Sequence, residues 1–199
     1  MPTVVLVEGR SDVAAVRAVA TTVGLPADAY RLVDMGGITN VRRRLDTVRD
    51  GRVLGMCDAG EAHVVARALR IEQSELGERG FSVCDADLED ELIRACGPDV
   101  VLGVLDRLGL GARFATFGNQ PAWRGRPVRE QLHRFAGTTS GRKALLAGAL
   151  AAELEPDQLP EPLVRLLERI ARRTSAHPVS SATAAAGIAS PSAKPPTAR

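Results

Sequence analysis

Acidic side chains follow three separate apolar segments of this chain. Glu8 and Asp12 come after residues 3–7, which read Thr-Val-Val-Leu-Val, and Asp58 comes after residues 52–57. A third apolar run, residues 80–84, is followed by three more acids: Asp85, Asp87 and Glu89. Carboxylates that are brought close together repel one another unless protons or cations neutralise them. Mg²⁺ or Mn²⁺ would neutralise them and still leave room for a phosphate oxygen and a water, so the pattern suggests phosphoryl transfer.

A purely structural interpretation of these acids also exists. Asp is a common helix cap, and Glu is favoured in the first turn of a helix. For any single acid, this interpretation is at least as good as a catalytic one. It is weaker for three strand ends together, so we predict that the six acids form a metal site.

The elements that would position these acids alternate between strands and helices. We predict strands over residues 3–7, 30–35, 52–57 and 81–84, and helices that begin near Ser11 or Asp12, at Thr39 or Asn40, near Glu61 and at Leu88. Such alternation predicts an α/β fold with a mostly parallel four-stranded sheet, in which ligands bind at the carboxyl ends of the strands. After Gly97-Pro98 the pattern becomes helical, with helices expected over residues 99–108, 128–135, 139–154 and 159–172.

Composition agrees with this fold class. The chain has 199 residues, 45% of them apolar and only 3% aromatic, so its core must come mainly from Val, Leu, Ala and Ile. We predict a catalytic domain over residues 1–97, a helical region over 98–173 and a disordered tail over 174–199. Three cysteines without metal-finger spacing indicate buried, reduced thiols, and no long apolar stretch is present. We therefore expect a soluble, cytoplasmic protein.

Three segments of the chain resemble a known family. Val7-Glu8-Gly9-Arg10-Ser11-Asp12, Asp58 with Gly60-Glu61, and the run from Asp87 to Leu92 look like the Toprim domain, particularly that of the OLD (overcoming lysogenization defect) nucleases. The resemblance implies a Mg²⁺- or Mn²⁺-dependent endonuclease that hydrolyses DNA. It implies that Glu8, Asp12 and Asp58 share one metal centre, that Glu89 supports a second, and that Asp85 and Asp87 are auxiliary. It also implies that Lys143 acts beside Glu8 and Asp58 in catalysis and neutralises charge on phosphate.

The chain departs from the family pattern in two ways. The usual Asp-x-Asp is Asp58-Ala59-Gly60 here, so the second acid is missing unless Glu61 or Asp85 replaces it. The full-length relatives also carry an ATPase domain that this chain lacks, so a separate ATPase subunit is one expectation and a homodimer is another. Two alternatives stay open: a Toprim ribonuclease of the ribosomal-RNA maturation type, and a catalytically weak Toprim module that binds nucleic acid or a partner. A topoisomerase is disfavoured, because the only tyrosine, Tyr30, precedes a predicted strand.

Basic residues offer contacts for a phosphate backbone. The candidates for nucleic-acid binding lie in two segments: Arg42 and Arg43, and then Arg124, Arg126 and Arg142. For the first segment, a solvated helix face is the more ordinary interpretation. Trp123 could stack on a base, but packing is the better prediction, and His63, His133 and His177 are assigned no catalytic role because none has a partner at metal-ligand spacing.

Overall fold

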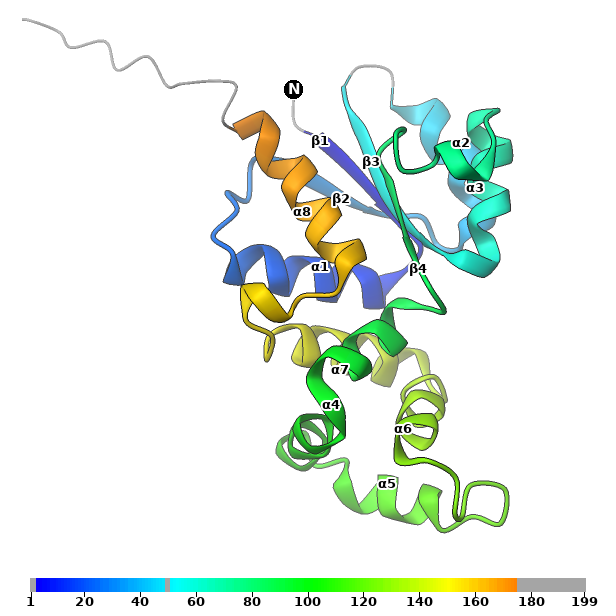
Figure 1. The fold of residues 1–199 in the computed structure, drawn as a ribbon, viewed down its shortest axis with the longest axis vertical. Helices are drawn as coiled ribbons and strands as arrows, with labels where there is room; N and C mark the ends of the chain where they lie inside the picture. Colours follow the sequence, from blue (N-terminus) through cyan, green and yellow to red (C-terminus); the bar gives the residue numbers. More distant parts are fainter. Residues whose placement is uncertain (1–2, 49–50, 175–199) are drawn as a thin grey trace, which may run out of the picture.

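A four-stranded parallel sheet forms the centre of the molecule. The computed structural model describes residues 3–48 and 51–174, so most of the predicted disordered tail lies outside the described residues. The strands are β1 (Thr3–Val7), β2 (Tyr30–Asp34), β3 (Val53–Asp58) and β4 (Phe81–Cys84). They pair in the order β2-β1-β3-β4, and every pairing is parallel (Figure 1). The predicted sheet is therefore confirmed.

The central strand β1 is buried on both faces, which explains why its sequence is continuously apolar. Val4 and Leu6 contribute to one core, and Val5 and Val7 contribute to the other. This alternation follows from the two-residue period of a strand, and strands covered on both faces read as unbroken apolar runs. Because β1 and β3 are neighbours, the side chains that follow them meet at one edge of the sheet.

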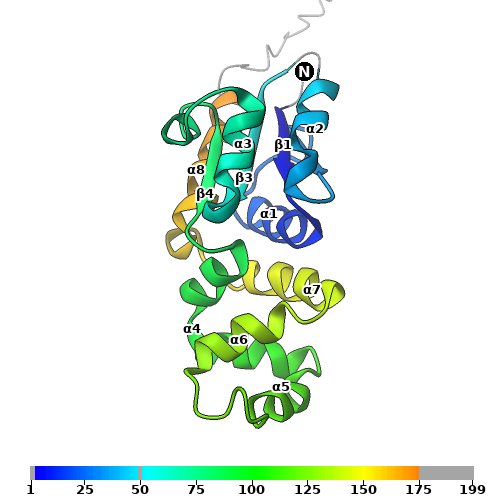
Figure 2. The ribbon, with the colours of Figure 1, turned by 90° about the vertical axis from the view of Figure 1, so that its right-hand side faces the viewer.

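Helices cover both faces of the sheet. On one face lie α2 (Val41–Thr47) and α3 (Ala62–Leu69), and α1 (Arg10–Thr22) lies on the other (Figure 2). The start of α1 was predicted near Ser11 or Asp12, which is slightly too late in the chain. The N-cap is Gly9, and the backbone N–H of Gly9 donates a hydrogen bond to a carboxylate oxygen of Asp12 at 2.9 Å. The helix expected to begin at Thr39 or Asn40 begins instead at Val41, because a 3₁₀ turn (η1, Ile38–Asn40) precedes it.

The second half of the chain is helical, as predicted. α4 (Leu88–Arg107) is interrupted at Gly97, whose φ of 73° and ψ of 157° are not helical, so it comprises two helices separated where the sequence indicated. It is followed by α6 (Val128–Ala136), α7 (Ser140–Ala151) and α8 (Glu161–Thr174). Between α4 and α6 lies α5 (Gly111–Gly118), a short helix that begins and ends at glycine and was not predicted from the sequence.

The helical half packs closely against the sheet. α7 lies along α1, and a Cβ added to Gly148 would stand 3.3 Å from the Cβ of Ala14. α8 returns to β3 and β4, as Figure 1 shows. A single apolar cluster contains Val5 from β1, Leu150 from α7 and Ile170 from α8. The domain boundary at residue 97 stays a prediction, and the core runs across it. No helix in the described part of the chain is long and apolar enough to cross a membrane.

Candidate metal centre at the carboxyl edge of the sheet

Three carboxylates meet where β1 and β3 end. Glu8 follows β1, Asp58 is the last residue of β3, and Glu61 closes a 3₁₀ turn (η2, Ala59–Glu61) that begins directly after Asp58. One carboxylate oxygen from each residue lies within 4.8 Å of the other two. The 3₁₀ turn brings the Glu61 carboxylate beside those of Glu8 and Asp58. A single divalent ion could bind all three carboxylates.

A cavity of about 320 Å³ extends this group. Its walls include Glu8, Asp12, Asp58 and Glu89, which brings four of the six predicted metal ligands together. Asp34, the last residue of β2, also lines it, and its carboxylate accepts a hydrogen bond from the Gly36 N–H at 2.8 Å. Asp34 was not among the predicted metal ligands, although an acid close to the end of a predicted strand could have indicated its place at this edge of the sheet.

The carboxylates of this cavity hold protons more tightly than usual. Burial, reinforced by the hydrogen bond and charge of Glu61, raises the pKa of Glu8 to about 7. Burial also raises the pKa of Asp58 to about 7, with further contributions from the charges of Asp87 and Glu8. For Asp12, burial raises the pKa to about 6. These raised values have the physical cause expected of acids gathered in a partly dry site without a cation.

Two buried oxygens in this region have no hydrogen-bond partner within the described residues. One is Oε1 of Glu89, whose residue is only 3% exposed, and the other is Oε2 of Glu61. A buried carboxylate oxygen without a donor is costly unless a cation or water satisfies it. Beside the three clustered carboxylates, these oxygens complete a set of donors that could hold a metal ion.

Lys143 reaches the cavity from the helical half of the chain. Its ammonium nitrogen, on α7, lies 3.1 Å from Oε2 of Glu89 on α4. Burial alone would lower the pKa of Lys143, but the charge and hydrogen bond of Glu89 outweigh it and raise that pKa. The lysine therefore remains an ammonium beside the carboxylates.

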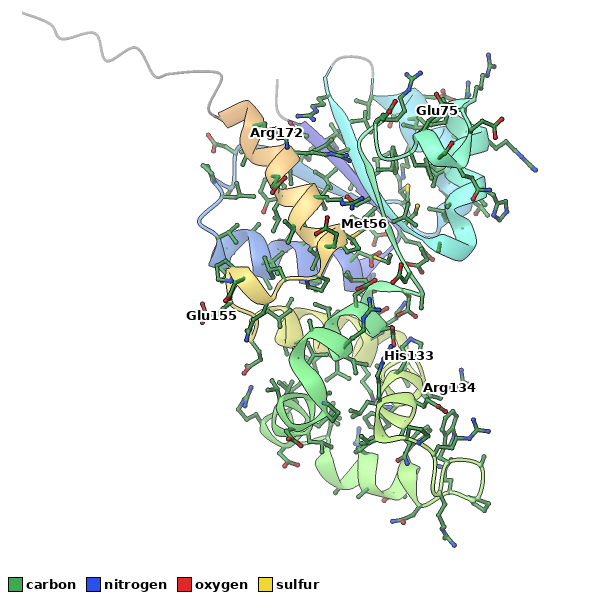
Figure 3. The ribbon with its side chains drawn as sticks, viewed as in Figure 1. Met56, Glu75, His133, Arg134, Glu155 and Arg172 are labelled. Atoms are coloured by element: carbon green, nitrogen blue, oxygen red, sulfur yellow. The ribbon has the colours of Figure 1, made fainter. Side chains whose placement is uncertain are left out.

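Asp87 stands next to the cavity and is held by two donors. Its Oδ1 accepts a hydrogen bond from the Asp90 N–H at 2.8 Å and so caps α4, and its Oδ2 lies 2.8 Å from Nε2 of His133. Burial would raise the pKa of Asp87, but the hydrogen bonds from His133 and the Asp90 N–H lower it. His133 projects from α6 toward the sheet, as Figure 3 shows. His133 was not predicted to take part in the site. It lies 46 residues after Asp87, and no spacing in the sequence signals their contact.

Asp85 is not brought to the acidic cavity. Its side chain is 83% exposed and lies 3.5 Å from Arg94. It lines a different cavity of about 420 Å³, together with Glu91, Arg94 and Arg165. Its backbone N–H donates to Oε1 of Glu91 at 3.1 Å, which fixes the turn after β4 with the Asp85 side chain directed away. The prediction of Asp85 as a metal ligand is therefore not supported by its position.

The five arginines predicted to bind nucleic acid do not line the acidic cavity. Arg42 donates to the Ala68 carbonyl at 3.1 Å, and Arg124 donates to the Asn119 carbonyl at 2.9 Å. Arg126 donates to the Ala122 carbonyl at 2.9 Å, and Arg142 donates to the Phe135 carbonyl at 3.0 Å and covers its ring. Arg43 is exposed on α2.

Trp123 packs as predicted, and two of the three cysteines are buried as predicted, whereas Cys96 is only partly buried. Trp123 stacks on Phe117, with ring centroids 5.2 Å apart, so packing is the correct interpretation of this ring. Cys57 and Cys84 are buried, and burial raises the pKa of the Cys57 thiol to about 12. A thiol with so high a pKa is a poor nucleophile at neutral pH.

Comparison with known proteins agrees with this architecture. No protein-family model matches the sequence, and no curated protein matches it significantly. Among solved structures, the C-terminal region of the Burkholderia pseudomallei OLD protein is similar at 19% identity and a TM-score of 0.63, covering 86% of this chain and 97% of that chain. The C-terminal region of the Xanthomonas campestris pv. campestris OLD protein is similar at 20% identity and a TM-score of 0.62, covering 87% of this chain and 96% of that chain. The chain therefore has the fold of the OLD C-terminal region, a Toprim-type parallel sheet followed by helices.

Proposed function

We propose that this chain is a divalent-metal-dependent nuclease that hydrolyses phosphodiester bonds of DNA. One observation carries the proposal: oxygens of Glu8, Asp58 and Glu61 lie within 4.8 Å of one another at the carboxyl edge of a parallel sheet. Ligand sites of open α/β sheets lie at this edge. The fold shared with OLD C-terminal regions supports the same reading.

The charged residues of the site have different roles in this proposal. Glu8, Asp58 and Glu61 hold a cation, and Asp12 and Glu89 extend the site on either side. Bound Mg²⁺ or Mn²⁺ would supply an acidic water and would stabilise charge on the scissile phosphate. Lys143 donates hydrogen bonds to a phosphate oxygen, where a fixed positive charge lowers the energy of the transition state.

Glu61 replaces the second acid of the family motif in this proposal. Its longer side chain starts from a 3₁₀ turn and still ends beside Glu8 and Asp58, with one oxygen buried and lacking a donor among the described residues. The chain would then have lost a motif without losing a ligand. Asp87 keeps a supporting role, because both of its oxygens already accept hydrogen bonds.

The test is cleavage of supercoiled plasmid DNA with Mg²⁺ or Mn²⁺, compared with the same reaction in EDTA. We expect the wild-type protein to nick or linearise the plasmid only with metal, and Glu8→Gln to reduce the rate to background. Asp85→Asn is the matched control, because it also removes one acid after a strand but lies outside the cavity. Cleavage by Glu8→Gln at the wild-type rate would reject the proposal.

Two further arms separate the alternatives. A structured RNA that is cut while DNA is left intact would indicate the ribonuclease alternative. Binding of DNA without Mn²⁺ binding and without cleavage of either substrate would indicate a Toprim binding module.

A further inference from the structure

A second, smaller cavity adjoins the acidic one. It has a volume of about 210 Å³, lies beside α6 and α7, and is lined by Asp87, Glu89, His133, Arg134, Gly137 and Lys143. Glu89 and Lys143 belong to the walls of both cavities, so the two cavities are direct neighbours. Figure 3 shows His133 and Arg134 on α6 at the end of that helix nearer the sheet.

The charges of this cavity leave one cation uncompensated. Lys143 pairs with Glu89 at 3.1 Å, and His133 pairs with Asp87 at 2.8 Å. Arg134 is exposed, and its side chain makes no ion pair or hydrogen bond with the described residues. The wall therefore presents the guanidinium of Arg134 beside two pairs of side chains that already bind each other.

The neighbouring arginines are bound differently. Arg129, also on α6, holds Asp90 through two carboxylate contacts at 2.7 and 2.8 Å. Arg142, on α7, covers the ring of Phe135 at 4.0 Å and donates to its carbonyl. These two guanidiniums join α6 to α4 and to α7, whereas Arg134 makes no such contact within the described structure.

We propose that this cavity binds a backbone phosphate of the nucleic-acid strand, adjacent to the phosphate held in the acidic cavity. The inference rests on the proposed function, because the acidic cavity sets where the strand lies. Arg134 offers paired N–H donors that match two phosphate oxygens, and Lys143 has further donors beyond the one that Glu89 uses. The residues that line the cavity include no Phe, Tyr or Trp, and the imidazole of His133 is held by Asp87, so the cavity suits a phosphate better than a stacked base.

The test is the binding of a labelled single-stranded oligonucleotide, measured by fluorescence anisotropy in EDTA so that no cleavage occurs. Arg134→Ala is compared with Arg113→Ala, which removes the same charge from α5 at the far end of the helical region (Figure 1). We expect Arg134→Ala to raise the dissociation constant roughly tenfold and to reduce the salt dependence of binding by about one counterion. Arg113→Ala should change the dissociation constant less than about twofold, as expected for a charge that makes no phosphate contact.

Several results would overturn the inference. One is equal weakening by the two variants, which would indicate general electrostatic attraction. Others are unchanged binding by Arg134→Ala and the absence of strand binding by the wild type. A free-anion site would be indicated if inorganic phosphate raised the melting temperature of the wild type and not of Arg134→Ala while both bound the strand equally, and this too would overturn the inference.

The outcome is separable from that of the proposed function. Weaker strand binding by Arg134→Ala, in a protein that cleaves nothing with any metal, would support the phosphate site and reject the nuclease. If the wild type cleaves with metal and Arg134→Ala binds and cleaves normally, the nuclease is supported and the phosphate site is rejected.

Discussion

The ammonium of Lys143 lies 3.1 Å from a carboxylate oxygen of Glu89, which is almost fully buried at the edge of the acidic cavity. The two residues belong to α7 and α4, so this ion pair joins the helical half of the chain to the site. This ion pair also makes the helical half part of the site. Without α7, Glu89 would have no cation beside it among the described residues.

Removing Lys143 should affect both activity and stability. Lys143→Met leaves Glu89 buried without a donor on either oxygen, so we expect a loss of roughly 1–3 kcal/mol in the free energy of unfolding in EDTA. Mn²⁺ should restore part of this loss, and cleavage should fall about 100-fold or more because a donor to phosphate is missing. Chemical denaturation with and without Mn²⁺ checks the first effect. Equal stability of variant and wild type in EDTA would contradict it.

Glu61 should behave as a metal ligand. Glu61→Gln keeps the shape of the side chain but removes its charge, so we expect the Mn²⁺ concentration at half-maximal cleavage to rise at least about tenfold. The maximal rate at saturating Mn²⁺ should fall less. Glu75→Gln is the control, because Glu75 is likewise a half-buried acid that ends a 3₁₀ turn but does not line the cavity. An unchanged metal requirement in Glu61→Gln would assign the site to the other acids alone.

The stability of the metal-free protein should fall as pH rises. The folded state raises the pKa of Glu8 and Asp58 to about 7 and that of Asp12 to about 6, chiefly through burial. Because the folded state binds these protons more tightly than the unfolded chain, their stabilisation is complete below about pH 4 and is lost as pH rises through 6 to 7.

We therefore expect the melting temperature in EDTA to decline between about pH 4 and pH 7. The decline should be smaller in the double variant Glu8→Gln, Asp58→Asn, which no longer titrates at those positions. Thermal melts across this range provide the measurement, and an identical pH slope in both proteins would show that these acids are not the cause.

Close packing beneath the site gives a stability prediction. A Cβ added to Gly55, in β3, would stand 2.2 Å from the ring of Phe81 in β4. Phe81 is fully enclosed, so the ring cannot swing away freely, and Gly55→Ala should cost roughly 1–3 kcal/mol. Gly60→Ala is the control, because a Cβ there meets no atom within 4 Å. Urea denaturation of the two variants would show the difference, and equal midpoints would contradict the packing.

The sequence was sufficient to predict the sheet and the acids that come directly off its buried strands. Unbroken apolar runs identify strands covered on both faces, and the parallel order then brings Glu8 and Asp58 to one edge. Position alone does not give side-chain direction: Asp85 and Asp87 both follow β4, yet only Asp87 points toward the site, because the turn after the strand is fixed by Glu91.

Contacts between distant segments were harder to predict. Lys143 was placed by family resemblance, whereas His133 had no signal, because its partner Asp87 lies 46 residues earlier in the chain. α5 was missed because it is short and bounded by glycines, so nothing in the sequence indicated that its two rings, Phe114 and Phe117, are buried core residues.

Calorimetric titration of Mn²⁺ into the wild-type protein and into Asp58→Asn tests the central claim most directly, since that claim is that carboxylates from different strands share a divalent cation. We expect saturable binding to the wild type and to the control Asp85→Asn, and an affinity at least about tenfold lower in Asp58→Asn. Absence of binding to the wild type, or equal affinity in Asp58→Asn, would contradict it.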